Sequence, residues 1–409
     1  MTTTKVGPTI DGPGAGDLAV ASAEVDAEEL GQILATTEEF IRTKVIPREQ
    51  EIADGNEIPA DLRQAARDLG LFGFAIPQQW GGLGLDLAQE VRLAEVLGYT
   101  SLALRSMFGT NNGIAGQVLV QFGTDEQKKT WLEKIASGEV VASFALTEDG
   151  AGSNPAGLRT KAVADGDEWV LTGEKRYITN APTADLFVVF ARYRDADSDG
   201  PGIAVFLVPA DAEGVSVAPA DKKMGQEGSL TATVHLDEVR VSAEALVGGD
   251  ADVGYRAAMT ILARGRIHIA AVAVGQEQRA LDESVTSAAV STQGGTPVGS
   301  NQLVQAMIAD MATQVMAGRT IVREAARQWV AETDRRIAPS MAKLFCTEML
   351  GTVADTAVQV HGGAGYMRGV VVERIFRDAR LLRLYEGTSE IQRLIIGGGL
   401  VKQAARRLQ

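Results

Sequence analysis

The sequence predicts an α+β protein in which one β module lies between two helical regions. Apolar residues recur at helical spacing from about residue 27 to 140, and again from 250 onward. Between about 143 and 245 the pattern changes to short runs of β-branched and aromatic residues bounded by Gly, Pro and Asp. Helices, then strands, then helices indicate separate α and β layers, because an alternating parallel-sheet fold would interleave them.

The same pattern divides the 409-residue chain into four segments. Residues 1–25 are rich in Gly, Ala, Pro and Ser and are expected to form a disordered leader. They lack the basic start and the apolar stretch of a secretory signal. An N-terminal helical domain is expected at 26–142, a middle β domain at 143–250 and a C-terminal helical domain at 251–409.

Composition argues against several classes of function. The net charge of −14 disfavours nucleic acid or an anionic membrane as a partner. No run of about 18 or more consecutive apolar residues occurs, so we expect no membrane span. The single cysteine, Cys346, cannot form an intrachain disulfide, which suits the cytoplasm. The three histidines lie in separate regions and no carboxylates are spaced as metal ligands, so no metal site is predicted.

The N-terminal helices are predicted from apolar spacing and from their ends. In AEELGQILATTEEFIRTKV, apolar residues lie at near-helical spacing from Leu30 to Ile41. The segment TDEQKKTWLEKIASG opens with Thr124 and Gln127 in the register of a capping box and closes on Gly138. Both segments are therefore predicted to be helical.

The strands and the C-terminal helices follow in order. Three runs predict strands: DLFVVFARY, GIAVFLVPA and SLTATVHLDEVRV. Three segments predict long helices: GYRAAMTILARGRIHIAAVAVGQEQRALDES, NQLVQAMIADMATQVMAGRTIVREAARQW and SMAKLFCTEMLGTVADTAVQV. The Gly-rich segment VSTQGGTPVGSN, residues 290–301, predicts a break between the first two.

The loop SFALTEDGAGSNPAG, residues 143–157, is a candidate for ligand binding. Thr147, Ser153 and several glycines would offer hydroxyls and backbone N–H groups to a flat polar ring or a phosphate. The loop is not a dinucleotide fingerprint, because Pro155 replaces the third glycine and a strand follows. An ordinary β-turn loop is the alternative interpretation.

Two further motifs lie at the ends of predicted elements. In GEKRYITNA, residues 173–181, Tyr177 and Thr179 would face the same side of a strand and so share one ligand. An aromatic residue there also suits a hydrophobic core. In VQVHGGAGYMRG, residues 358–369, a helix meets three glycines whose bare backbone suits a diphosphate or adenine, although a plain helix cap has the same pattern.

The segment LYEGTSEIQR, residues 384–393, places Glu386 just before a predicted helix. Ser389 and Gln392 have the spacing of a capping box, so Glu386 would lie at the positive end of the helix dipole and tend to stay ionised. Gly387 leaves room for a ligand to approach. These properties suit a general base. A glutamate that only stabilises the helix dipole is the alternative.

Together, ALTEDGAGSN, GEKRYITN, VQVHGGAGY, RDAR and YEGTSEIQR, in this order and spacing, resemble the acyl-CoA dehydrogenase family over about residues 27 to 400. The resemblance implies an N-terminal all-α domain, a middle β-sheet or barrel domain and a C-terminal four-helix bundle. It implies FAD as cofactor, acyl-CoA as substrate and electron-transferring flavoprotein as electron acceptor. An acyl-CoA oxidase, and a non-catalytic or lyase relative, are the alternatives.

The resemblance also assigns residues. Glu386 matches the catalytic base, and the position used by some other members is Gly265 here, which has no side chain to serve. Residues 359–363 match the segment that holds a neighbouring subunit's FAD, which implies a homo-oligomer, expected to be a tetramer. The implied FAD contacts are Phe144, Leu146, Thr147, Ser153, Tyr177, Thr179, Gln302, Gln359, Gly362, Gly363, Thr388 and Glu390. The implied substrate contacts are Ser153, Arg266, Gly387 and Arg105.

Two departures from the family pattern stand out. Ser291 and Gly294 occupy the Arg and Phe places of the usual Arg-x-x-Phe-Gly motif, whose arginine reaches the FAD diphosphate across a subunit interface. Arg105 falls where glutaryl-CoA dehydrogenases carry the arginine that pairs with the distal carboxylate of the substrate. A short or medium fatty acyl chain is the default substrate, and a solvated or internally paired Arg105 is the alternative to a ligand contact.

Overall fold

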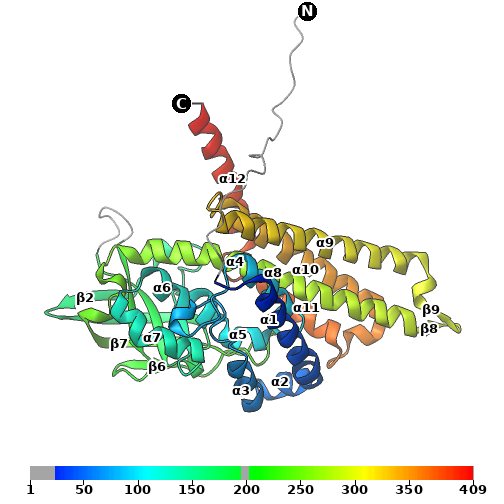
Figure 1. Cartoon of the computed structure of the whole chain (residues 1–409), viewed down its shortest axis with the longest axis horizontal. Helices are drawn as coiled ribbons and strands as arrows, with labels where there is room; N and C mark the ends of the chain where they lie inside the picture. The colour runs from blue at the N-terminus through cyan, green and yellow to red at the C-terminus, as the bar shows by residue number, and fades with distance from the viewer. Residues whose placement is uncertain (1–23, 195–201, 409) are drawn as a thin grey trace, which may run out of the picture.

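The computed structural model describes residues 24–194 and 202–408, so nearly all of the expected leader lies outside the described residues. Along the chain, one curled β-sheet lies between two helical regions, which confirms the predicted helix–sheet–helix order. Figure 1 shows the strands at the left and the long C-terminal helices at the right. In the sequence, the strands of the sheet connect the first helical region to the last. The candidate site is built where the first and last regions meet.

The N-terminal region consists of short helices with well-formed ends. The helices are α1 (Ala27–Phe40), α2 (Glu49–Gly55), α3 (Ala60–Asp68), α4 (Leu87–Gly98), α5 (Leu102–Gly109), α6 (Ala115–Phe122) and α7 (Asp125–Ser137). The predicted capping box of α7 is confirmed, because the Thr124 hydroxyl accepts from the N–H of Gln127 and the Gln127 amide oxygen accepts from the N–H of Thr124. Gly138, with φ of 74°, ends α7 as predicted.

The middle region is a seven-stranded mixed sheet in the described residues. Its strands are β1 (Ala142–Ala145), β2 (Lys161–Asp165), β3 (Glu168–Thr179), β4 (Leu186–Arg192), β5 (Ile203–Pro209), β6 (Val215–Val217) and β7 (Thr231–Ser242). The order is β1-β4-β2-β3-β7-β6, with β5 also paired to β4. Every residue of β4 and β5 except the last is buried, which explains why their sequences are continuous apolar runs without alternation.

The C-terminal region is a bundle of long helices. They are α8 (Val253–Val290), α9 (Gln302–Val330), α10 (Ile337–His361), α11 (Val371–Leu382) and α12 (Ser389–Arg407). The helices α8, α9 and α10 lie side by side (Figure 1), and with α11 they enclose an apolar core that includes Val274, Val315, Leu350 and Ile375. The predicted break at 290–301 is a small hairpin of β8 (Thr292–Gln293) and β9 (Thr296–Pro297) at the end of the bundle.

The helix α8 is apolar and long enough to cross a membrane by length and composition. No run of 18 consecutive apolar residues occurs in it, since Arg264, Arg266 and His268 lie within this helix, so the expectation of no membrane span stays a prediction. However, 83% of its most apolar 18-residue window is buried inside the protein. Burial among α4, α9 and α10 accounts for the apolar sequence, since a helix that is apolar all round suits a protein core.

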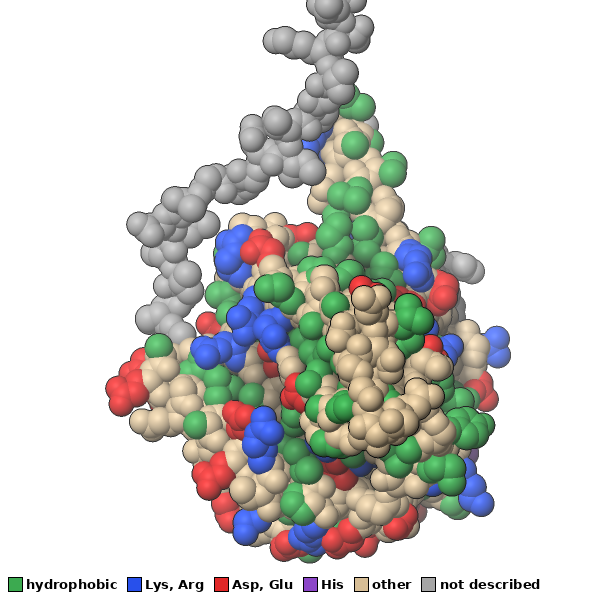
Figure 2. Space-filling view, turned by 90° about the vertical axis from the view of Figure 1, so that its right-hand side faces the viewer, with side chains coloured by type: hydrophobic (Ala, Val, Ile, Leu, Met, Phe, Trp, Pro, Cys, Tyr) green, Lys and Arg blue, Asp and Glu red, His purple; other side chains and the backbone are tan. Residues whose placement is uncertain are grey.

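The helix α12 projects from the body of the molecule (Figure 1). Of its residues only Ser389, Gln392 and Gly399 are buried, and every residue from 400 to 408 is exposed. Hydrophobic side chains remain uncovered on it, among them Leu394 and Val401, and apolar groups run up the projecting column in Figure 2. Exposed apolar side chains that gather on one element are typical of interaction sites.

Candidate active site

The turn between α11 and α12 holds Glu386 in an unusual backbone conformation. Its φ is 52° and that of Gly387 is 91°, so two consecutive residues lie in the left-handed region. A residue with a side chain pays about 1–2 kcal/mol for this conformation, whereas glycine adopts it freely. The Glu386 carboxylate then rests on α8, because a Cβ built on Gly265 would lie 2.2 Å from its Oε2.

The carboxylate of Glu386 accepts no hydrogen bond from residues 24–194 or 202–408. Its Oε2 is buried and unpartnered among the described residues, although the residue as a whole is half-buried. Burial raises the pKa of Glu386 above its ordinary value, and three cations oppose that rise: Arg105, Lys343 and Arg266. A carboxylate with a free lone pair and a raised pKa has the properties of a general base.

Side chains from neighbouring helices fix the backbone of this turn. Lys343 on α10 is fully buried and its Nζ donates to the carbonyl oxygen of Gly387 at 2.8 Å. The Nε2 of Gln392 donates to the carbonyls of Gly387 at 2.9 Å and Glu386 at 3.3 Å. Burial lowers the pKa of Lys343 to about 8. The strained conformation of Glu386 is therefore held from two sides.

The helix after the turn begins one residue earlier than predicted. Thr388, not Ser389, is the N-cap of α12, and its hydroxyl accepts from the N–H of Ile391 at 3.4 Å. The capping box predicted for Ser389 and Gln392 is wrong. Ser389 instead donates its hydroxyl to Glu348 on α10, so a tertiary partner takes the side chain that a local cap would have used.

The positive charges around Glu386 have few partners. Arg266 is 8% exposed, its Nε is buried without a partner, and no hydrogen bond or ion pair to it exists within 24–194 and 202–408. Arg105, half-buried on α5, donates its Nε to Nε2 of His268 at 3.0 Å and forms no ion pair with a described carboxylate. Three cations therefore surround one carboxylate. Because unpaired buried charge is costly, a ligand that brings negative charge is the natural complement.

The loop after β1 is anchored by a buried ion pair that the sequence did not predict. The Nζ of Lys175 donates to Oε1 of Glu148 at 2.6 Å, and both side chains are buried. The same carboxylate accepts from Thr160 through the backbone N–H and the hydroxyl. These bonds fix the segment 146–153, so Thr147 and Ser153 lie on an ordered loop, half-buried and exposed respectively. The ordinary β-turn interpretation understates this anchoring.

Tyr177 is not a core residue. Its side chain is 61% exposed, its φ is 57°, and the pairing of β3 with β7 shifts register beside it. Ile178 is buried and Thr179 is half-buried. That Tyr177 and Thr179 share one ligand stays a prediction. The N–H of Arg176 donates to the carbonyl of Thr147 at 2.8 Å, which joins this end of β3 to the 146–153 loop. An exposed aromatic beside an anchored loop suits a flat ring.

The predicted flavin contacts thus fall into two groups. Phe144 and Leu146 are buried beside the loop, and Thr388 and Glu390 open α12 at the Glu386 turn. The second group lies apart: Gln302, Gln359, Gly362 and Gly363 are all exposed. Gln302 begins α9 beside the β8–β9 hairpin, and the helix rise along α8 separates Gly265 from that hairpin by roughly 40 Å. This second group does not share the Glu386 site within one chain.

Ser291, at the position where the family pattern has an arginine, lies between the end of α8 and the β8–β9 hairpin. Ser291 caps α8, and its carbonyl accepts from the N–H of Val298 at 2.8 Å. Gly294 lies at the hairpin tip with φ of 59°. Both residues are exposed, and neither carries a charge. The sequence-based expectation of a changed cofactor contact here stays a prediction.

Sequence comparison places the whole described chain in one family. Models of the N-terminal, middle and C-terminal domains of acyl-CoA dehydrogenase match residues 27–139, 143–239 and 252–401. The chain belongs to the acyl-CoA dehydrogenase family. Probable acyl-CoA dehydrogenase YngJ of Bacillus subtilis is 38% identical over 378 residues, which cover 92% of this chain and 98% of the relative.

Solved structures agree with this acyl-CoA dehydrogenase fold. Glutaryl-CoA dehydrogenase from Mycobacterium smegmatis superposes with a TM-score of 0.84 at 31% identity, covering 92% of this chain and 95% of the other. Acyl-CoA dehydrogenase from Bacillus anthracis, complexed with FAD, gives 0.86 at 33% identity, covering 95% and 69%. A chain from the electron transferring flavoprotein structure of Acidaminococcus fermentans gives 0.88 at 32% identity, covering 92% and 99%.

As a member of this family the protein is a FAD-dependent oxidoreductase. The site fits the cofactor, because Tyr177 is exposed and Gly150 has open space beside it. The 146–153 loop is anchored to β3 beside Tyr177. Several residues that shape the site were not predicted, namely Glu148, Lys175, His268 and Lys343. The sequence could have indicated that Lys175 is buried, because alternation along the strand places it on the same face as the apolar Leu171.

Proposed function

We propose that this acyl-CoA dehydrogenase converts an acyl-CoA thioester to the trans-2-enoyl-CoA, with Glu386 as the base. The observation that carries the proposal is the buried, unpartnered Oε2 of Glu386 above Gly265. Two C–H bonds break and a C=C bond forms: the α-proton moves to Glu386 and the β-hydrogen leaves with its electron pair. Bound FAD would accept that pair as a hydride. A carboxylate without competing donors keeps its lone pair for the substrate.

The thioester oxygen needs stabilisation as the α-proton leaves. The backbone N–H of Glu386 donates no hydrogen bond within the described residues, so it is available to that oxygen. Lys343 and Gln392 hold the adjoining carbonyls, which keeps the N–H fixed in direction. Arg266 and Gly387 border the same turn and are proposed to contact the CoA thioester end. Ser153, on the anchored loop, is proposed to contact substrate and cofactor.

A second substrate class is supported by Arg105. Its guanidinium faces Glu386 closely enough to lower the pKa of that carboxyl, yet it forms no ion pair with a described carboxylate. An acyl group with a terminal carboxylate would supply the missing partner through a bidentate, charge-assisted pair. A short or medium fatty acyl chain remains the first candidate, and a short dicarboxylyl chain is the second.

Partners and assembly complete the proposal. Electron-transferring flavoprotein is proposed as the acceptor, supported by the similarity to a chain in the Acidaminococcus fermentans structure; molecular oxygen, as in an oxidase, is the alternative. A homo-oligomer, expected to be a tetramer, would let the 359–363 segment, with its exposed Gln359, Gly362 and Gly363, and Gln302 complete a neighbour's FAD site. The uncovered apolar side chains of α12 support such contacts. The cytoplasm is the proposed location, with neither nucleic acid nor membrane as a partner.

The test is anaerobic reduction of the purified flavoprotein by a panel of acyl-CoAs, in wild type and Glu386→Gln. The variant should keep its FAD and bind acyl-CoA but lose roughly three orders of magnitude or more in kcat, as removal of a general base commonly does. Bleaching by chains of different length and terminus identifies the substrate class. A Gln variant that turned over within about tenfold of wild type would remove Glu386 from the role of base.

A further inference from the structure

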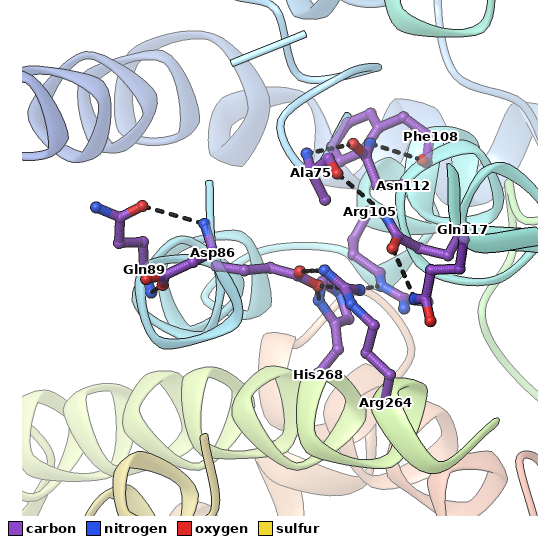
Figure 3. Close-up of polar contacts among 11 residues, drawn as sticks. Ala75, Asp86, Gln89, Arg105, Phe108, Asn112, Gln117, Arg264 and His268 are labelled. Atoms are coloured by element: carbon purple, nitrogen blue, oxygen red, sulfur yellow. Dashed lines mark hydrogen bonds and ion pairs between the residues drawn. The ribbon is translucent and has the colours of Figure 1, made fainter. Parts of the chain in front are cut away.

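A buried chain of polar groups connects Arg105 to α4. Glu90, which is 0% exposed, accepts from Arg264 and from Nδ1 of His268, the latter at 2.7 Å. His268, 1% exposed, accepts on its Nε2 from Nε of Arg105 at 3.0 Å. Figure 3 shows Arg105 reaching from α5 toward His268 and Arg264, which both stand on α8. Arg264 and His268 are one helical turn apart, so they meet the same carboxylate.

The hydrogen bonds assign the imidazole proton. An ionised carboxylate only accepts, so Nδ1 of His268 must carry the proton that Glu90 receives. Arginine only donates, so Nε2 must offer a lone pair to Arg105. Both conditions hold for a neutral ring with its proton on Nδ1. Burial and the charge of Arg105 lower the pKa of His268 to about 4, which agrees with a neutral ring.

The orientation of the ring and of the guanidinium is also fixed by packing. The His268 ring stacks on Phe74 with centroids 6.0 Å apart and planes inclined by 6°. On α5, Gly109 lies one turn beyond Arg105, and a Cβ there would meet Cζ of Arg105 at 3.0 Å. The bare glycine therefore makes room for the guanidinium. With Nε engaged by His268, the two Nη groups make no hydrogen bond within the described residues.

We propose that His268 is a positioning residue: held in one tautomer by Glu90, it binds Nε of Arg105 and leaves both Nη groups free to pair with a carboxylate at the far end of the acyl group. The proposal rests on the role of Arg105 given above and deepens it. An arginine held at Nε offers its two Nη groups in a fixed fork, and a preorganised fork loses less entropy on binding a carboxylate.

A positioning role and a purely structural role differ in which substrates they affect. If His268 only filled space and stabilised the fold, its loss would affect all acyl-CoAs alike. If it positions Arg105, its loss affects a dicarboxylyl substrate and spares an alkyl one. His268→Phe keeps the aromatic ring against Phe74 but has neither hydrogen-bonding nitrogen. His268→Gln keeps one donor and one acceptor and is the conservative rescue.

The experiment measures kcat/KM for glutaryl-CoA and butyryl-CoA in His268→Phe, His268→Gln, Arg105→Ala and the double variant His268→Phe/Arg105→Ala. Arg105→Ala should lose roughly thirtyfold on glutaryl-CoA and less than about threefold on butyryl-CoA. His268→Phe should lose about tenfold on glutaryl-CoA alone, and His268→Gln should recover most of it. The double variant should be no worse than Arg105→Ala, because the two residues act as one unit.

Controls separate the positioning role from folding. His235→Phe changes an exposed histidine on β7 and should leave both substrates unaffected. FAD content and thermal unfolding are measured for every variant. If His268→Phe does not fold, Gly109→Ala gives a second route, because the added Cβ displaces the guanidinium without touching His268 and should reduce glutaryl-CoA turnover selectively.

Each outcome has a distinct meaning. Equal losses of His268→Phe on both substrates, or losses that add to those of Arg105→Ala, overturn the positioning role. A selective loss in Arg105→Ala with none in His268→Phe overturns it as well, while the role of Arg105 stands. No selective loss in Arg105→Ala itself overturns the dicarboxylate role, and with it the proposal for His268, while Glu386 as base is unaffected.

Discussion

At the scale of single residues, the turn that holds Glu386 depends on the absence of a side chain at Gly265. The sequence excluded Gly265 as a base because glycine has no functional group. The structure adds that the bare α-carbon of Gly265 is where the Glu386 carboxylate lies, since a Cβ there would be 2.2 Å from Oε2. The two positions, 121 residues apart in the sequence, therefore compete for one volume. Only one of them can carry a carboxylate without displacing the other.

Gly265→Ala should separate activity from stability. The new methyl displaces the carboxylate of Glu386, and because misplacing a reacting group by about 1 Å can cost on the order of a hundredfold, we expect kcat to fall at least roughly tenfold. The free energy of unfolding should hold or rise by up to about 1 kcal/mol, since alanine favours a helix interior over glycine. Steady-state kinetics and urea unfolding test this. Gly31→Ala, whose methyl meets nothing within 4 Å, is the control. Unchanged kcat would contradict the placement of the base.

The pH dependence of turnover follows from the cations around Glu386. The base acts when ionised, so kcat/KM rises with pH through its pKa, which burial raises and Arg105 lowers. Arg105→Ala removes a charge that favours the ionised form. The acid limb of the profile should therefore move to higher pH, even with butyryl-CoA, which has no distal carboxylate. Arg240→Ala, an exposed arginine on β7, is the control. A limb that stays in place or moves to lower pH counts against this coupling.

At the scale of elements, the loop after β1 depends on a contact made across the sheet. Residues 146–153 have glycines and few apolar side chains, so little local packing would order them. The buried pair of Glu148 with Lys175 of β3 supplies the order. Because β3 also carries Tyr177, the same strand positions both the loop and the exposed aromatic ring. The order of the 146–153 loop and the position of the Tyr177 ring therefore depend on the same strand.

Lys175→Met tests whether the buried pair of Glu148 and Lys175 orders this loop. Removing one partner of a buried pair leaves an uncompensated charge, so we expect the free energy of unfolding to fall by about 3–5 kcal/mol and FAD retention to weaken. The double variant Glu148→Gln/Lys175→Met keeps one oxygen to accept from Thr160 and removes both charges, at the loss of the acceptor for the N–H of Arg159. It should recover a large part of the loss. Denaturant unfolding and flavin absorbance after desalting measure both effects. A double variant less stable than Lys175→Met alone would contradict the explanation.

At the scale of the whole molecule, α8 links two distant regions. One helix of 38 residues, roughly 57 Å long, carries Gly265 near the sheet and ends in the β8–β9 hairpin. The predicted FAD contacts at Gln302 and at 359–363 are exposed and do not join the Glu386 site of their own chain. In an oligomer each chain would thus bring a base to one site and cofactor contacts to another. Assembly and cofactor retention are then linked by mass action.

Cofactor retention at the hairpin should respond to a restored charge. Ser291 stands where the family pattern has an arginine, so FAD should dissociate on dilution or gel filtration, and Ser291→Arg should slow that loss. Ser300→Arg places the same charge just after the hairpin and controls for a general electrostatic effect. Flavin fluorescence released against time measures the rate. Equal rates in wild type and Ser291→Arg would show that this position does not reach the diphosphate.

The sequence predicted what local patterns encode. The order of helices and strands, the capping box at Thr124 and the break at 290–301 follow from short-range spacing, and the structure has all three. The contacts that shape the site were not predicted because they join distant positions: Glu90 and His268 are 178 residues apart. The one-residue error at α12 has the same cause, since Glu348 on another helix binds the Ser389 hydroxyl.

The projecting end of α12 offers a direct report on assembly. Three consecutive glycines, 397–399, lie within this helix, each costing about 1 kcal/mol of helix stability relative to alanine. Every residue from 400 to 408 is exposed, so an isolated subunit has little tertiary packing to stabilise its last helical turns. Backbone amides from 400 to 407 should then exchange with deuterium quickly in dilute protein and slowly in concentrated protein, where a second copy covers them. Exchange that is slow and independent of concentration would mean that this helix needs no neighbour.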